Sequence, residues 1–415
     1  MPSSSFLMLL GGLLVLAFVA EEAFRWLRVP TVLVLMGCGL LLGPVAHVLP
    51  AQEFVRVAPH FGALAFLLIL FEGGLDLDVH EVMHRLRPGA LLALIGFGVA
   101  FALGAGVAWA SGLPLASSIA LGVVLAPISG AIILPLAGQL GLRQEVRTLV
   151  ILEGALADVL GVLTMGLVVR LLTGGGVAGL VALGSLFAAA FSVLLAVICG
   201  LLWPRLLRPL ADRRFVHVLT FGVALALWGA VEQLGASGAL VVLTFGLTLA
   251  NEQEILSALH VDAAPVVEVA HDVVERLHHF IGQLTFLVRA FFFVFLGVVV
   301  QINTLPPRRL LEAAAILTLF VAGRWLVLRV LQCRGHLGLE RHEELVVWFL
   351  QPRGLVNAVL AIEVAHLAVP GSEGFLGMAS LLILGTNVAM AIGIRRPGAS
   401  VAECATGSSQ DGLVT

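Results

Sequence analysis

The chain has 415 residues, of which 60% are hydrophobic and 12% are charged, with a formal net charge of -3. This composition is far more apolar than that of a soluble protein, so we exclude a soluble enzyme and a nucleic-acid-binding protein and expect a protein of the lipid bilayer. The four cysteines are scattered and predict neither a disulfide framework nor a metal site, and no cofactor is expected.

Apolar runs long enough to cross a bilayer follow one another along most of the chain. They predict an all-α polytopic membrane protein with about thirteen transmembrane helices. Because no basic residue precedes the first run, we interpret it as a retained helix and not as a cleaved signal peptide. The expected spans are 5–22, 31–49, 58–75, 88–110, 115–140, 147–170, 177–202, 215–233, 236–250, 283–301, 309–330, 342–367 and 373–394.

Two segments differ from these spans. The connection 251–282 mixes polar and apolar residues, which predicts an amphipathic helix at the membrane interface. It carries His271, His278 and His279, for which we favour a solvated helix face over a pH sensor. The tail 397–415 is rich in small and polar residues and is expected to be disordered.

The arginines predict the orientation of the chain in the membrane. If the N-terminus lies outside, most arginines of the connections, such as Arg85, Arg143 and the group in 205–214, face the cytoplasm. Positively charged residues are enriched on that side of membrane proteins. We therefore expect an integral protein of a bacterial inner membrane with its N-terminus outside and its C-terminus in the cytoplasm.

Proline and glycine interrupt two of the expected spans near mid-membrane. Pro127 and Gly130 lie in the span 115–140, and Pro352, Arg353 and Gly354 lie in the span 342–367. Non-helical backbone at this depth is tolerated only where it lines a cavity or is buried in protein, and paired interruptions are typical of inverted-repeat transporters. The sequence favours two broken helices that cross at a binding site; the alternative is two kinked helices without a ligand.

Asp158 lies near the middle of its span, about 16 Å from the start at 1.5 Å per residue. A charged side chain at this depth costs at least about 2.5–3.5 kcal/mol, so such residues usually face a cavity or a partner. We find no cation matched to Asp158 in depth, which favours a site for a cation or a proton over a purely structural aspartate.

Other charged residues within the spans have different interpretations. Glu153, Arg324 and Arg289 share a depth of about 9 Å from the cytoplasmic side, which favours a structural ion pair over an ion ligand for Glu153. The guanidinium group of Arg353 stays charged and suits an electrostatic gate. Glu72, towards the inner end of its span, fits a solvent-facing carboxylate and a site residue equally well.

The motifs of the chain, taken in order, resemble those of a known family. The chain resembles the monovalent cation/proton antiporter superfamily, most closely its NhaP-like sodium/proton antiporter branch, over essentially the whole membrane region. The motifs that carry the resemblance are Arg28-Val-Pro30, Gly37 to Pro44, Phe71-Glu72-Gly-Gly-Leu-Asp76, Glu232 to Gly238, Phe291 to Gly297 and Pro352-Arg353-Gly354.

The resemblance implies one membrane transporter domain over 1–396. Within it, a core bundle of about 88–170 and 309–394 would carry the crossing, and panel or dimerisation helices of about 5–75 and 177–301 would support a homodimer. It further implies elevator-like alternating access, with a monovalent cation and protons as the transported partners.

The resemblance also assigns site residues. It implies that Asp158 is the ion- and proton-binding residue, that Glu153 pairs with Arg324, and that Glu72 can join the coordination sphere. Ser129 is a further candidate ligand. The metal that the resemblance implies is therefore a monovalent cation bound at Asp158.

Two departures from the family pattern affect this site. Ile128-Ser129-Gly130 stands where the family usually has Thr-Asp-Pro, and Glu153-Gly154-Ala-Leu-Ala157-Asp158 stands where it has Glu-Ser-x-x-Asn-Asp. Oxygen and amide groups that would bind or frame a hard cation are therefore missing. A single titratable carboxylate still suffices for competition between a cation and a proton.

These observations support three hypotheses. The first is a secondary antiporter that exchanges a monovalent cation, sodium in the first place, for protons at Asp158 and serves pH homeostasis. The alternatives are a potassium/proton antiporter and a transport-incompetent regulatory member of the fold. We do not expect an enzyme, because an intramembrane hydrolase using Asp158 with Ser129 lacks a second carboxylate at matching depth.

Overall fold

The structure is a computed structural model that describes residues 3–27, 31–46, 51–138, 140–172, 178–210, 213, 215–258, 267–299, 307–366, 369 and 371–394. All regular secondary structure within these residues is helical. The tail 397–415 lies outside the described residues, as does the expectation that it is disordered.

In the described part of the chain, 7 helices are long and apolar enough to cross a membrane. They are α4 (Val79–Ala110), α7 (Gln144–Leu172), α8 (Ala178–Leu207), α9 (Val216–Gln233), α12 (Val267–Val299), α13 (Pro307–Cys333) and α16 (Phe375–Ile394). The other helices are α1 (Ser3–Leu27), α2 (Thr31–Leu40) with its continuation η1 (Leu41–Val45), α3 (Ala51–Leu75), α5 (Leu115–Leu125), α6 (Gly130–Ala137), α10 (Gly238–Ala250), α11 (Glu252–Ala258), α14 (Arg341–Phe349) and α15 (Leu355–His366). The predicted all-helical, multi-span class is confirmed.

The prediction for 251–282 was wrong over its second half. The short α11 lies within this connection, but α12 begins at Val267 and continues without a break through the expected span 283–301. Leu277 and Ile281, one helical turn apart, are fully buried, so one face of this polar stretch packs against the protein. The mixture of polar and apolar residues in the first part of α12 thus reflects a helix with one face buried against its neighbours and the other face exposed.

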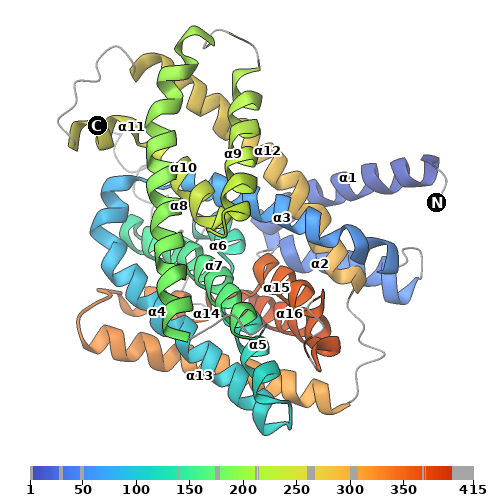
Figure 1. Cartoon of the computed structure of the whole chain (residues 1–415). Coiled ribbons are helices and arrows are strands. Elements are labelled where there is room, and N and C mark those ends of the chain that lie inside the picture. Colours follow the sequence, from blue (N-terminus) through green and yellow to red (C-terminus); the bar gives the residue numbers. More distant parts are fainter. Residues whose placement is uncertain are drawn as a thin grey trace, which may run out of the picture.

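Packing divides the helices into two groups of neighbours (Figure 1). In one group, α4 packs against α5, α7 and α13, and α16 packs against α13, α14 and α15. In the other group, α10 packs against α3, α8 and α9, and α12 packs against α2, α3 and α9. The groups meet where α15 packs against α3 and where α7 packs against α8.

Both proline- and glycine-containing spans are broken. Between α5 and α6 the chain is unwound from Ala126 to Ser129, and between α14 and α15 it is unwound from Leu350 to Gly354. Proline removes a backbone donor and clashes with the preceding turn, which stops a continuous helix here.

Side chains at the ends of the helices fix where α14 begins. Glu340 and Glu343 form a capping box at its start. Arg143, in the connection before α7, donates from Nε to Glu343 at 2.8 Å and from Nη2 to the same carboxylate at 2.6 Å. These hydrogen bonds raise the pKa of Arg143 above its usual range. The pair joins the start of the second broken span to the connection that follows the first.

Candidate ion-binding site

The two unwound segments meet each other directly. The backbone N–H of Ser129 donates to the carbonyl oxygen of Pro352 at 2.8 Å. A methyl group added at Gly354 would collide with the Ser129 hydroxyl, so the second segment needs glycine at this position. The crossing therefore depends on close approach of backbone to backbone.

Asp158, on α7, lies beside the start of α6. It is 1% exposed, and its Oδ2 accepts a hydrogen bond from the Gly130 N–H at 3.0 Å. Gly130 is the first residue of α6, so the carboxylate faces the positive end of a helix dipole. Its second oxygen, Oδ1, is buried and has no hydrogen-bond partner among the described residues. That oxygen is free to take a proton or a cation.

Glycines bring α7 and the first broken span together. A Cβ at Gly154 would lie 2.7 Å from Cα of Gly130, and one at Gly161 would collide with the ring of Pro127. Gly130 and Gly154, one residue from each of the two departures from the family pattern, are therefore in contact with each other. Because neither residue has a side chain, α7 and α6 approach each other closely at this point.

This contact predicts that two glycine-to-alanine substitutions in α7 differ in their effect on stability. Gly154→Ala is expected to lower the stability of the folded protein by about 1–3 kcal/mol, because the added carbon overlaps the backbone of α6. Gly166→Ala, also in α7, is the matched control, because a Cβ at Gly166 would have no neighbouring heavy atom within 4 Å. It is expected to be neutral or to stabilise by up to about 1 kcal/mol. Thermal unfolding in detergent checks both, and equal melting temperatures for the two variants would refute the tight contact.

Ser129 is also buried at the crossing. Its side chain is fully inaccessible, and its hydroxyl has no hydrogen-bond partner in the described residues. The hydroxyl lies against Gly354 of the second segment, while its neighbour Gly130 contacts Asp158. Ser129 thus supplies an unused oxygen at the crossing.

Glu153 forms a buried ion pair with Arg324 of α13. Both side chains are at most 3% exposed, Nη2 of Arg324 lies 2.7 Å from Oε2 of Glu153, and Nη1 bonds Oε1. Nη2 also donates to the carbonyl of Val347, at 3.3 Å. The fork of the guanidinium group matches both carboxylate oxygens, so each oxygen of Glu153 has a positively charged partner.

The structure does not place Arg289 with Glu153. Arg289 lies on α12, where its charge acts on Glu72 of α3, and α12 packs against α2, α3 and α9. Two residues at the same depth in the membrane need not be in contact, because their helices can pack against different neighbours. The expected contribution of Arg289 to the pair of Glu153 was wrong.

Glu72 lies in a charged cluster between α3 and α12. It is half-buried, and Asp76, Arg289 and His278 act on it electrostatically. Nε2 of His278 lies 2.6 Å from Oδ1 of Asp76. His279 is exposed, and the side chain of His271 lies outside the described residues.

Arg353 is buried at the crossing and serves the ends of two helices. Its Nε donates to the carbonyl of Leu125, the last residue of α5, at 3.2 Å, and Nη1 donates to the carbonyl of Gln351 at 3.1 Å. The guanidinium carbon lies 4.5 Å from the centre of the Phe320 ring. A fixed positive charge at these carbonyls offsets the negative ends of the helices.

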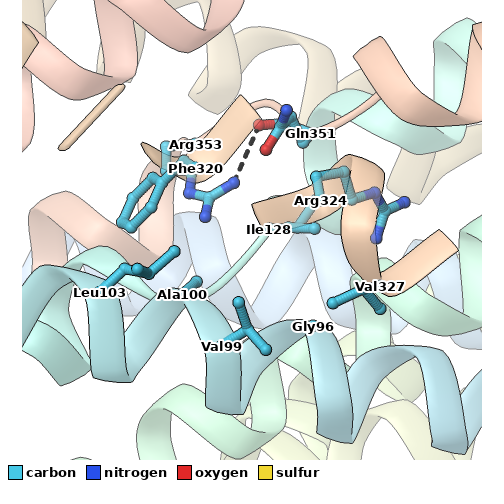
Figure 2. A pocket seen from close by; sticks show the side chains of 10 residues that line it. All are labelled: Gly96, Val99, Ala100, Leu103, Ile128, Phe320, Arg324, Val327, Gln351 and Arg353. Carbon is cyan, nitrogen blue, oxygen red and sulfur yellow. Dashed lines mark hydrogen bonds between the residues drawn. The ribbon is translucent and has the colours of Figure 1, made fainter. Parts of the chain in front are cut away.

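A narrow pocket lies between α4, α13 and the crossing. Figure 2 shows Arg353 beside Phe320, with its hydrogen bond to Gln351, and Arg324 farther along the same pocket. The walls are mostly apolar, and the lining residues are Gly96, Val99, Ala100, Leu103, Ile128, Phe320, Arg324, Val327, Gln351 and Arg353. Two positively charged side chains, Arg324 and Arg353, therefore line the pocket beside the crossing.

Sequence reasoning missed three polar residues that hold the second segment. Asn357, Thr386 and Asn387 are buried and hydrogen-bond to backbone groups of the crossing. The signal was present, because Asn357 follows Gly354 by three residues, as in a helix cap, and Thr386-Asn387 interrupts an apolar run. Among the described residues, no group of three or more histidine, cysteine, aspartate or glutamate side chains is placed to hold a metal ion.

Known proteins resemble this chain at the level of family and of fold. A family model described as "Sodium/hydrogen exchanger, transmembrane" matches residues 12–396. No curated protein sequence matches the chain.

The chain is also similar to solved structures of the sodium proton antiporter MjNhaP1 from Methanocaldococcus jannaschii. A structure at pH 8 has a TM-score of 0.73 and 19% identity, covering 98% of this chain and 99% of that chain. A second, from an electron-microscopy map, has a TM-score of 0.73 and 19% identity and covers 100% of both chains. At this identity the likeness establishes the shared fold.

Proposed function

Because this chain belongs to the sodium/hydrogen exchanger family, a family of transporters and not of enzymes, we propose that it exchanges a monovalent cation for protons at Asp158. The observation that carries the proposal is the state of this carboxylate. It is buried in α7, one oxygen is held by the first N–H of α6, and the other has no partner within the described chain. A lone carboxylate in such a place binds a proton or a cation.

Exchange follows from exclusive occupancy of one site. A proton on Oδ1 removes the negative charge that attracts a cation, and a bound cation disfavours protonation. If the protein changes its access only when the site is occupied, each cation carried one way is matched by a proton carried the other way. One carboxylate then gives electroneutral exchange of one cation for one proton.

Alternating access requires two bodies that move against each other. We assign the core to about 88–170 and 309–394 and the panel to about 5–75 and 177–301, within one domain over 1–396. The two groups of packed helices, which meet at α15 with α3 and at α7 with α8, support this division. By analogy with the family we place a homodimer at the panel, the N-terminus outside and the C-terminus in the cytoplasm of a bacterial inner membrane.

Sodium is the first cation to test, and potassium is the second. Oδ1 of Asp158 and the Ser129 hydroxyl are buried side-chain oxygens at the crossing that have no hydrogen-bond partner among the described residues. Hard cations need several oxygen ligands, so backbone carbonyls and water must complete the shell, with Glu72 as a further candidate. A site with few fixed ligands favours the more easily dehydrated potassium ion, which is the observation in favour of the second candidate.

The proposal is tested with purified protein in liposomes that carry an imposed pH gradient. Sodium, lithium, potassium and rubidium are added in turn while the internal pH is followed from about pH 5.5 to 9, a range that spans shifted carboxyl and histidine groups. Collapse of the gradient by one or more of these ions establishes exchange and identifies the cation. Absence of a response to every ion would overturn the proposal and favour a regulatory protein that has retained only the fold.

A further inference from the structure

The crossing leaves the ends of helices inside the membrane region. α5 ends at Leu125 and α15 begins at Leu355, so the last carbonyls of α5 and the first N–H groups of α15 have no partner within their own helices. Lipid offers no hydrogen bonds, and an unsatisfied backbone group is costly there. Side chains must supply these partners.

Asn357 supplies several of them at once. It is fully buried, and its Oδ1 accepts the N–H of Gly354 at 2.8 Å. Its Nδ2 donates to the carbonyl of Val124 at 2.9 Å and to the carbonyl of Pro127 at 3.1 Å. A primary amide offers two donors and an acceptor, and here all three functions are used. Asn357 therefore caps α15 and at the same time ties it to the end of α5 and to the unwound segment.

The segment that Asn357 holds is the one that contacts Asp158. Pro127, whose carbonyl accepts from Asn357, packs against Gly161 of α7. Three residues further along, Gly130 donates its N–H to Asp158. The unwound segment Ala126–Ser129 is thus anchored by Asn357 at one end and by Asp158 at the other.

The second unwound segment, whose Gly354 is bound by Asn357, is also anchored from α16. The hydroxyl of Thr386 accepts the N–H of Arg353 at 3.0 Å, and Nδ2 of Asn387 donates to the carbonyl of Arg353 at 2.9 Å. Asp158 still holds the first segment and α16 still holds the second when Asn357 is substituted. The substitution therefore acts chiefly on the hydrogen bonds that Asn357 makes between the two broken spans.

We propose that Asn357 is a positioning residue of the ion site, whose amide holds the unwound segment Ala126–Ser129 in the register that Asp158 needs to bind its ion. This inference rests on the proposed exchange at Asp158 and adds a residue whose side chain hydrogen-bonds to Gly354, Val124 and Pro127.

The chemistry at this position is specific to an amide. Alanine leaves one N–H and two carbonyls without their partner. An ionised carboxylate accepts but does not donate, so it is repelled by the carbonyls of Val124 and Pro127. A protonated carboxyl group of the same shape donates one hydrogen bond and accepts another, which restores most of the link.

Two variants test the inference through exchange in liposomes. Asn357→Ala is expected to raise the apparent KM for the cation about tenfold or more at every pH. Asn357→Asp is expected to approach wild-type exchange at the acidic end of the range and to lose about tenfold or more at the alkaline end, relative to wild type at the same pH. Ser380→Ala is the matched control, because Ser380 is fully buried in α16 and its hydroxyl has no partner in the described residues; its KM is expected to stay unchanged.

A second measurement separates this inference from the proposed function. In hydrogen–deuterium exchange, the backbone amides of Ala126, of 128–130 and of Gly354 are expected to exchange at least about tenfold faster in Asn357→Ala than in wild type. Should Asn357→Ala fail to fold, the pH comparison in Asn357→Asp and its exchange protection at acidic and alkaline pH carry the test. If the variants had the KM, the pH profile and the hydrogen-exchange protection of wild type, the inference would be overturned. If the wild-type protein itself showed no cation/proton exchange, the proposed function would be overturned, and the hydrogen-exchange experiment would decide on Asn357.

Discussion

Asp158→Asn is expected to abolish cation-driven proton movement while the protein remains folded. The asparagine side chain has the same shape, and its carbonyl oxygen still accepts the N–H of Gly130, so the start of α6 keeps its cap. It carries no negative charge and takes up no proton, so it attracts no cation and couples none. A loss of exchange of about 100-fold or more, down to the leak of protein-free liposomes, is the expected result.

The control for this variant must change a carboxylate elsewhere. Glu312→Gln is suitable, because Glu312 pairs with Arg308 and Arg309 at the first turn of α13, away from the crossing. It is expected to exchange as wild type does, and the melting temperatures of both variants in detergent are expected to stay near that of wild type. Normal exchange by Asp158→Asn would contradict the proposed role of Asp158.

Glu153→Ala is expected to act on stability instead of exchange. Removing Glu153 leaves the guanidinium group of Arg324 buried without its carboxylate, which costs about 3–5 kcal/mol. Such a loss is a large part of the free energy that holds a domain folded. Thermal unfolding in detergent measures it, and exchange is expressed per folded molecule so that loss of protein is not counted as loss of function.

The double variant Glu153→Leu with Arg324→Leu distinguishes a structural pair from an ion ligand. Replacing both charges by apolar side chains removes the unpaired charge, so this variant is expected to be more stable than either single variant. It is also expected to keep exchange within a few-fold of wild type. If the single variant Glu153→Ala retained its melting temperature but lost exchange, Glu153 would belong to the ion site.

The broken spans and the buried carboxylate of Asp158 were accessible to sequence reasoning because their signals are local. Pro127 and Gly130, and Pro352 and Gly354, disrupt helices through their own backbone chemistry. Asp158 stands out because a carboxylate in an apolar run is costly wherever it points. Neither argument needs to know which helices are neighbours.

The rest depended on neighbours that the sequence does not specify. Depth in the membrane matched Arg324 and Arg289 equally well to Glu153, but α13 brings Arg324 to it and α12 brings Arg289 to Glu72. The links of Asn357 to Val124 and Pro127 join residues 233 and 230 positions apart. Likewise, the contact of Gly154 with Gly130 brings together one residue from each of the two departures from the family pattern, a contact that the sequence does not reveal.

Proton release on cation binding tests the central claim most directly. Purified protein in weakly buffered detergent solution receives sodium or potassium, and a pH indicator records the protons set free while calorimetry records the cation bound. The account predicts release that approaches one proton per bound cation where Asp158 starts protonated, decreasing as the pH rises, and no release from Asp158→Asn. Cation binding without proton release at every pH, or equal release from Asp158→Asn, would contradict the claim that one carboxylate carries both ions in turn.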